Sequence, residues 1–397
     1  MDDLKIPRDK YDDYSQESVS RRLQWLEQRT DKKLPYLKGT PYPPSEVKGT
    51  CENYIGTVGI PVGIAGPLLI NGVRAKGKFL VPMATMEGAL VASYSRGMRV
   101  ITESGGCDVV TLDNAAGTYR HLSDVISKVS AVILKSAADR EKFDQWLRVN
   151  TDNIVNAVNS TSRYANLVEL APLYQGDIVG LLFKYNTGEA MGLNMASKAN
   201  EAACKYILDQ CEYVVDYFNT LGGDKRFVNS EGKGKYVSAS VCIPERLIQD
   251  KLRSTPRRMS RYLSACNSIL NQQGSTAMNI HVANALTAMY ISCGQDPAFV
   301  TASFKNACTT FELSETGDLL ASLTLPNVIV GSVGSGSRLP AQKECLVILG
   351  CAHDARKLAE VIAAVALAGE ISVAGAVTAG EFSLAHTTLG RGVTNTK

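Results

Sequence analysis

The pattern of apolar and polar positions changes between residues 119 and 217, and this change predicts an inserted unit. Between residues 119 and 217, short apolar runs alternate with amphipathic stretches. The elements predicted there are strands at 125–135 and 177–185 and helices at 140–158 and 197–218. A β-α-β-α order with short loops is typical of a compact α/β unit. We therefore expect an α+β protein in which a ferredoxin-like domain at 119–217 interrupts a large domain formed by 50–118 and 218–397.

The stretch 81–97 predicts a helix that is surrounded by protein on most sides. Pro82 ends an apolar approach strand, Gly97 offers a stop, and small or apolar residues lie between them. Glu87 does not fit that setting, because a buried carboxylate loses its hydration and must be paired with a cation or protonated through a raised pKa. A protonated carboxyl group is a proton donor. The alternative is a Glu87 in the first turn that only favours the helix dipole.

The two ends of the chain differ from the middle in composition. Residues 1–49 are charged and rich in tyrosine, with one helical segment at 18–28, and we expect a small helical N-terminal arm. Near the other end, 361–384 is long enough and low enough in charge to raise the question of a membrane span. This stretch is rich in Ala and Gly and is interrupted by Glu370 and Glu381. We therefore expect a close-packed core helix or helix pair, and no membrane segment.

Composition and charge exclude several classes of protein. A length of 397 residues suggests two or three domains with large cores. A net charge of +3 without an arginine-rich stripe argues against nucleic-acid binding. The 10 cysteines are scattered without a Cys-x-x-Cys pair, which predicts neither a metal site nor a disulfide framework and favours the reducing cytoplasm. The first residues are too polar for a secretory signal.

Several polar groups besides Glu87 have the chemistry of an active site. Asp224-Lys225-Arg226 follows two glycines, so a cation-rich loop has room for a ligand; the alternative is a solvated turn. His281 and Asn284 are three positions apart and share one helical face, although a satisfied core pair is commoner. Asp296 follows a helix and precedes a proline, which also suits a simple turn. His386 is an isolated histidine near the C-terminus.

Two loops suit a phosphorylated ligand. The first, Val333-Gly-Ser-Gly-Ser337, precedes Pro340 and an apolar helix, so free backbone N–H groups can meet an anion at a helix N-terminus. It is not a Gly-x-Gly-x-x-Gly sequence after a strand, so a Rossmann unit is not supported. The second loop, 189–197, opens a long helix, and Ser197 is its expected cap.

The order of these motifs resembles that of the 3-hydroxy-3-methylglutaryl-coenzyme A (HMG-CoA) reductase family, in the soluble catalytic portion of its eukaryotic and archaeal class. The resemblance extends over roughly residues 50–390. The motifs that carry it are Glu52-Asn-Tyr-Ile-Gly, Ile60-Pro-Val-Gly-Ile-Ala-Gly-Pro-Leu, Pro82-Met-Ala-Thr-Met-Glu-Gly, Met191-Gly-Leu-Asn-Met, Asp224-Lys225, His281-Val-Ala-Asn, Gly294-Gln-Asp296, Val333-Gly-Ser-Gly-Ser and Ala385-His386.

The resemblance implies the NADPH-dependent reduction of a thioester to an alcohol through a hemithioacetal and an aldehyde. It implies that Lys225 is the cation beside the carbonyl oxygen, where each hydride addition leaves negative charge. Glu87 is then the proton donor near the same oxygen, and Asp296 lies between the two groups and tunes both pKa values. Asn284 helps to hold the lysine. His386 protonates the departing thiolate of coenzyme A.

The resemblance also implies a cofactor site and a partner. The large domain surrounds a central helix, the inserted small domain binds NADP(H), and the active site forms between the two subunits of a homodimer. The implied cofactor-binding residues are Met191, Gly192, Asn194 and Met195 in one loop and Gly334, Ser335 and Gly336 in the other. The implied substrate-binding residues are Asp224, Arg226 and Arg120.

Three positions depart from the family's acyl-recognition pattern. Gly117 stands where the family has an arginine for the free carboxylate of the substrate, with Arg120 nearby. Phe218 replaces a serine that contacts the acyl group. Arg226 replaces a lysine, which keeps the charge but changes its shape.

These departures leave three hypotheses for the function. The first is the reduction of HMG-CoA to mevalonate, as in isoprenoid biosynthesis. The second is a diverged family member that reduces another acyl-CoA or a carrier-bound acyl thioester. The third is a non-catalytic protein that binds coenzyme A or a nucleotide, and the joint presence of Glu87, Lys225, Asp296 and His386 argues against it.

Overall fold

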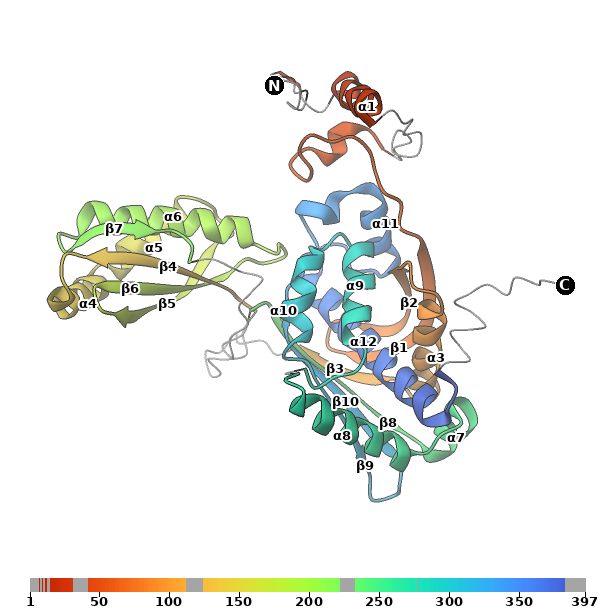
Figure 1. Ribbon diagram of the computed structural model, residues 1–397. Coiled ribbons are helices and arrows are strands. Elements are labelled where there is room, and N and C mark those ends of the chain that lie inside the picture. Colours follow the sequence, from red (N-terminus) through yellow and green to blue (C-terminus); the bar gives the residue numbers. More distant parts are fainter. Residues whose placement is uncertain are drawn as a thin grey trace.

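The computed structural model describes residues 7, 9, 11–12, 15–30, 42–111, 124–221, 233–275 and 277–382. These residues form two β-sheets in separate parts of the molecule, and most helices pack around the larger sheet (Figure 1). The mixture of helices and sheets confirms the predicted α+β class.

The larger sheet has six strands in the order β2-β1-β3-β8-β10-β9. All neighbouring strands are antiparallel except β1 and β3. The strands are β1 (Val62–Gly72), β2 (Lys76–Ala84), β3 (Cys107–Thr111), β8 (Lys235–Ile243), β9 (Cys308–Leu313) and β10 (Leu319–Val328).

The smaller sheet has four antiparallel strands in the order β5-β6-β4-β7. Its elements, in chain order, are β4 (Ile126–Leu134), α4 (Arg140–Val149), α5 (Thr151–Asn159), β5 (Asn166–Gln175), β6 (Ile178–Asn186), α6 (Leu193–Gln210) and β7 (Val214–Phe218). Helices α5 and α6 pack against one face of this sheet (Figure 1). A β-α-β-β-α-β order with a single antiparallel sheet is a ferredoxin-like arrangement, which confirms the expected type of unit. The expected β-α-β-α order is incomplete, because it lacks strands β5 and β7.

Two predicted helices in this part are wrong in detail. The helix expected at 140–158 is broken at Asn150 into α4 and α5. The helix expected at 197–218 ends early, because α6 stops at Gln210 and the last residues form strand β7. The sequence Val-Val-Asp-Tyr-Phe is rich in β-branched and aromatic residues, which suit an edge strand paired with β4.

Helix α12 (Ala355–Ala379) is the central helix of the large part and contacts α3 (Leu90–Glu103), α9 (Val282–Ser292) and the six-stranded sheet. Among the described residues, it is the one helix long and apolar enough to cross a membrane. Its most apolar window is 94% buried inside the protein. The stretch is therefore a core helix, which confirms the prediction made from its Ala, Gly and Glu residues.

The remaining helices surround this core. They are α1 (Gln16–Thr30), α7 (Glu245–Leu252), α8 (Pro256–Gln272), α10 (Val300–Phe304) and α11 (Pro340–Ile348), with short 3-10 turns at Pro44–Val47, Ala137–Asp139, Pro297–Phe299 and Ser335–Arg338. Helix α1 packs through Val19 and Leu23 against Val47 and Tyr54. The buried guanidinium of Arg22 donates to the carbonyl oxygen of Tyr54 at 2.8 Å, which fixes the arm to the following segment.

The helix predicted at 81–97 is wrong at both ends. Strand β2 continues through Pro82 to Ala84, because β2 is an edge strand and a proline is tolerated there. Helix α3 begins only at Leu90, after a left-handed Ala89 with φ of 68°. Gly97 is not a stop but lies inside α3, where an added Cβ would lie 1.9 Å from the carbonyl oxygen of Ala368. Glycine there lets α3 approach α12 closely.

Candidate functional site

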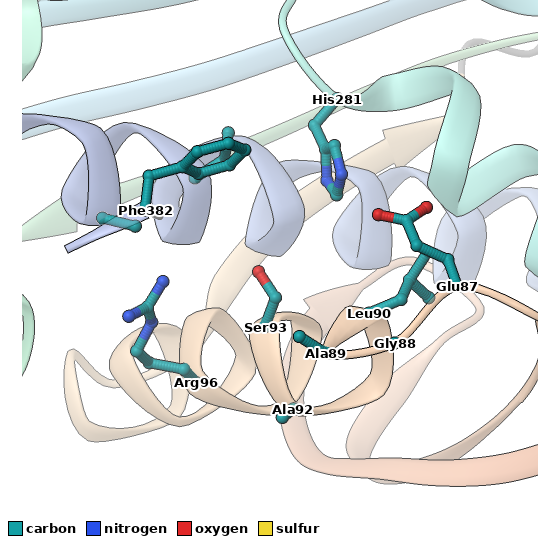
Figure 2. A pocket seen from close by; sticks show the side chains of 11 residues that line it. Glu87, Gly88, Ala89, Leu90, Ala92, Ser93, Arg96, His281 and Phe382 are labelled. Carbon is teal, nitrogen blue, oxygen red and sulfur yellow. The ribbon is translucent and has the colours of Figure 1, made fainter. Parts of the chain in front are cut away.

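A pocket of about 210 Å³ lies where the start of α3, the residue before α9 and the C-terminal half of α12 meet (Figure 2). We call it the Glu87 pocket. It is lined by Glu87, Gly88, Ala89, Leu90, Ala92, Ser93, Arg96, His281, Val373, Ala376 and Phe382. Figure 2 shows Glu87 and His281 on one side of it and Arg96 and Phe382 on the other. The pocket thus has mostly apolar walls, with ionisable side chains on two sides.

Glu87 lies in the turn before α3 and is exposed in the single chain, so the predicted burial of this carboxylate within a helix is wrong. Its position is nevertheless defined. The side-chain amide of Asn284 donates to Glu87 Oε2 at 2.8 Å, and the Glu87 backbone N–H donates to Thr85 Oγ1 at 2.9 Å. Two of the predicted catalytic residues, 197 positions apart, therefore touch in the structure.

His281 immediately precedes α9 and faces the same pocket. Its ring stacks on the buried ring of Tyr94, with 5.3 Å between the centroids, and Tyr94 O–H donates to the His281 carbonyl oxygen at 3.0 Å. Burial raises the pKa of Tyr94 well above its usual value, and the charges of Glu370 and Glu87 raise it further. Tyr94 thus remains a neutral hydrogen-bond donor across the pH range of the protein.

Arg96 is a charged group of the pocket that belongs to none of the sequence motifs given above. Its guanidinium donates to Ser372 Oγ at 2.9 and 3.1 Å and to the Ser372 carbonyl oxygen at 2.8 Å. Ser93 Oγ, one turn earlier on α3, lies 3.0 Å from Ser372 Oγ. These contacts hold the cation in one orientation at the pocket wall.

The predicted cofactor residues surround a second cavity of about 280 Å³, which we call the loop cavity. Its lining residues are Ala190, Met191, Gly192, Leu193, Asn194, Met195, Gly294, Gln295, Asp296, Gly331, Val333, Gly334, Ser335 and Ser337. Gly336 lies beside Gly294, since an added Cβ at Gly336 would be 2.6 Å from the Gly294 carbonyl oxygen. The fold thus brings the two predicted loops together, and Asp296 lies with them rather than in the Glu87 pocket.

Backbone contacts give the loop cavity its shape. Ala190 and Val333 form a parallel β-bridge. The side-chain amide of Gln295 donates to the Gly331 carbonyl oxygen at 2.9 Å and accepts from the Gly331 N–H at 2.8 Å. Glu189 Oε2 accepts from Ser332 Oγ at 2.7 Å and from the Ala355 N–H of α12 at 2.6 Å. Gln295 and Glu189 lie within predicted motifs, but the sequence does not reveal their roles, because their partners are far away in the chain.

The helix ends beside this cavity differ from the prediction in one respect. Helix α6 begins at Leu193 after a left-handed Gly192, so Ser197 is not its cap. The Ser197 hydroxyl instead donates to the Leu193 carbonyl oxygen within the helix. Asp296 caps a short turn, where its Oδ1 accepts from the Ala298 N–H at 3.0 Å.

Several predicted residues lie outside the described part of the chain. These are Arg120, Asp224, Lys225, Arg226 and His386, together with Gly117. Their roles stay predictions. Phe218, the position that the resemblance predicts to replace a serine, lies on β7 with 54% of its surface exposed.

Comparison with known proteins gives one family. A family model described as hydroxymethylglutaryl-coenzyme A reductase matches residues 18–391. The 3-hydroxy-3-methylglutaryl-coenzyme A reductase of Methanocaldococcus jannaschii is 37% identical over 87% of this chain and 85% of its own. The protein of the same name from Pyrococcus horikoshii is 35% identical over 93% of this chain and 91% of its own.

Solved structures give the same fold. The class II 3-hydroxy-3-methylglutaryl-CoA reductase of Streptococcus pneumoniae, bound to NADPH in open conformations, matches with a TM-score of 0.65. The match covers 93% of this chain and 100% of that chain at 17% sequence identity.

Proposed function

The chain belongs to the hydroxymethylglutaryl-coenzyme A reductase family, and from this premise we propose that it reduces HMG-CoA to mevalonate with NADPH. The observation that best supports the proposal is the contact between Glu87 and Asn284 at the mouth of an apolar pocket. A pocket with mostly apolar walls suits the acyl end of a coenzyme A thioester. The carboxyl group at its end suits proton transfer to the reacting oxygen.

In the proposed mechanism, side chains of this protein stabilise the negative charge on the reacting oxygen and donate the protons. Negative charge develops on the thioester oxygen, and the ammonium group of Lys225 stabilises it. Glu87 delivers the proton, and the Asn284 amide orients its carboxyl group. His386 protonates the leaving thiolate of coenzyme A. Asp296, in the wall of the loop cavity, is the carboxylate that we propose to tune the pKa values of Glu87 and Lys225.

The loop cavity suits NADPH, which supplies the hydride when it is bound. Gly334 has φ of 78°, and a Cβ added there would meet no protein atom within 4 Å, so this backbone faces open space. The lining of the cavity is rich in glycine and in backbone groups, which can approach phosphates closely. We assign Met191, Gly192, Asn194, Met195, Gly334, Ser335 and Gly336 to cofactor binding.

We further propose that the site is completed in a cytoplasmic homodimer. Glu87 is exposed in the single chain, whereas a proton donor works best where water is excluded. Large apolar side chains are exposed nearby on β1 and β2, namely Val62, Ile64 and Leu80. A second subunit over this edge would cover them. All 10 cysteines are free, which fits a reducing compartment.

The decisive experiment incubates the purified protein with NADPH and a panel of acyl-CoA thioesters. Oxidation of NADPH and release of free thiol are followed together. Turnover of HMG-CoA with release of coenzyme A supports the proposal. Turnover of only a smaller or less acidic thioester would instead favour the diverged enzyme that Gly117 and Phe218 suggest, and binding without NADPH oxidation would contradict an enzymatic function.

A further inference from the structure

The central helix α12 carries two carboxylates that are completely buried, Glu360 and Glu370. Each accepts hydrogen bonds from successive backbone N–H groups and from one threonine hydroxyl. The donors to Glu360 are the N–H groups of Arg74 at 2.9 Å and Ala75 at 2.7 Å and the hydroxyl of Thr111 at 3.2 Å. The donors to Glu370 are the N–H groups of Ile280, at 2.9 Å, and of His281, and the hydroxyl of Thr309 at 2.7 Å.

The two carboxylates hold different parts of the molecule. Glu360 binds the turn between β1 and β2, which lines neither the Glu87 pocket nor the loop cavity. Glu370 binds the residues that start α9. Three positions after His281 on that helix, Asn284 makes its contact with Glu87. A short, continuous path therefore leads from the Glu370 carboxylate to the proposed proton donor.

The start of α9 is held from two sides. The His281 N–H donates to the Glu370 carboxylate. The His281 carbonyl oxygen accepts from the Tyr94 O–H of α3 at 3.0 Å. The Tyr94 ring fits here because the neighbouring residue of α12 is Gly369, where an added Cβ would lie 2.4 Å from Tyr94 Cε1. The first turn of α9 thus has little freedom to shift relative to α3, which follows Glu87 in the chain.

We infer that Glu370 is a positioning residue, which fixes the first turn of α9 so that the Asn284 amide reaches the Glu87 carboxylate. The inference rests on the proposed function, since it assigns Glu370 a role in orienting the proton donor of that reaction. It predicts that loss of Glu370 lowers kcat. The KM for NADPH stays unchanged, because none of the groups bound by Glu370 lines the loop cavity.

Glu370→Gln tests the inference, with Glu360→Gln as a matched control. Glutamine keeps the size of the side chain but turns an acceptor oxygen into an NH₂ group that faces N–H donors. We expect Glu370→Gln to lower kcat by roughly 10- to 100-fold, the effect of a small misplacement of a catalytic group. Glu360→Gln, with the same burial and the same kinds of donor, leaves kcat near the wild-type value.

A double-mutant cycle separates positioning from general destabilisation. If Glu370 acts through Asn284, then Glu370→Gln adds little to the effect of Asn284→Ala on kcat. Glu360→Gln and Asn284→Ala should act independently. The inference would be overturned if the losses of kcat in Glu370→Gln and Asn284→Ala multiplied in the double variant. It would also be overturned if Glu370→Gln and Glu360→Gln lost kcat equally.

Two further measurements keep the test decisive. If Glu370→Gln does not fold, Thr309→Val removes one donor to Glu370 without changing the size of the side chain, and Thr111→Val is its control. Thr309→Val should lower kcat in the same non-additive way, and an unchanged kcat would count against the inference. Amide hydrogen exchange at 280–284 should rise in the Glu370 variant and not in the Glu360 variant. Unchanged amide exchange in the Glu370 variant would overturn the inference, whether or not the wild-type protein is active. A wild-type protein that reduced no thioester would refute only the proposed function.

Discussion

The Glu87 pocket and the loop cavity are built by different means. Side chains on helices α3, α9 and α12 define the Glu87 pocket, where Asn284 holds Glu87 and Ser372 holds Arg96. Backbone groups and glycines line much of the loop cavity, and the Gln295 side chain beside it bonds to the backbone of Gly331. The first region should therefore fail when a side chain changes its chemistry. The second should fail when the backbone path changes.

Glu87→Gln should have the largest effect. Glutamine keeps the shape and can still contact Asn284, but it cannot deliver a proton, so we expect kcat to fall by about 10²- to 10⁴-fold. The KM for NADPH should not change. Steady-state oxidation of NADPH with a saturating thioester measures both constants. Glu103→Gln is the control, because this carboxylate lies at the far end of α3 and pairs with Arg99 and Lys251 at the surface. Near-normal turnover of Glu87→Gln would remove Glu87 from the mechanism.

Lys225→Ala should rank next. Loss of one group that stabilises an oxyanion costs about 10²–10³ in kcat. The fold should be intact, because the sequence around Lys225, after two glycines, predicts a loop. Circular dichroism checks the fold, and single-turnover kinetics measure the rate of thioester reduction. A variant that reduces the thioester at the wild-type rate would show that another cation acts at the carbonyl oxygen.

Gly331→Ala tests the other side of the comparison. A Cβ at this position would lie 2.5 Å from the Met191 backbone N, so one of the two cofactor loops must move. Overpacking costs about 1–3 kcal/mol, and we expect the KM for NADPH to rise roughly tenfold with little change in kcat. Gly59→Ala is the control, because an added Cβ there meets nothing within 4 Å. A fall in kcat without a change in this KM would mean that the loop cavity does not hold the cofactor.

The two regions also differ in what the sequence reveals. The two loops of the loop cavity can be recognised in the sequence, because glycine-rich loops before helices have a local signature, and the structure brings both into the wall of one cavity. Glu189 and Gln295 are not predictable, since their roles depend on contacts with Ala355 and Gly331. These partners come together only in the folded chain.

The Glu87 pocket is predicted less well. Strand β2 before Glu87 and helix α3 after it are both apolar, so the sequence does not show where one ends and the other begins. The apolar pattern gives no sign that β2 continues through Pro82 or that Ala89 adopts a left-handed conformation. Both features depend on tertiary structure: the edge position of β2 and the packing of α3 on α12 through Gly97. The chemistry of Glu87 can be read from its motif, but its exposed position before the helix cannot.

The pH dependence of stability provides a smaller test of the helix-built region. Burial raises the pKa of the Glu370 carboxyl above 4.5, although hydrogen bonds from Ile280, Thr309 and His281 oppose the rise. The folded protein then binds more protons than the unfolded chain between these two pKa values. The free energy of unfolding therefore falls as pH rises through the folded pKa, by about 1.36 kcal/mol for each unit of separation. Urea unfolding at several pH values measures this against Glu370→Gln, and a wild-type advantage that grows with pH would contradict it.

The smallest effect concerns a thiol directly beside the loop cavity. Cys293 is completely buried, next to Gly294 in the cavity wall, and burial raises its pKa to about 12. At pH 8 only about one molecule in 10⁴ then carries the reactive thiolate. Limited alkylation with iodoacetamide, read by peptide mass spectrometry, should modify the exposed Cys51 and Cys242 and leave Cys293 intact. Rapid modification of Cys293 in the native protein would mean that the wall of the loop cavity opens readily. The loop cavity would then differ from the Glu87 pocket in mobility as well as in the groups that form it.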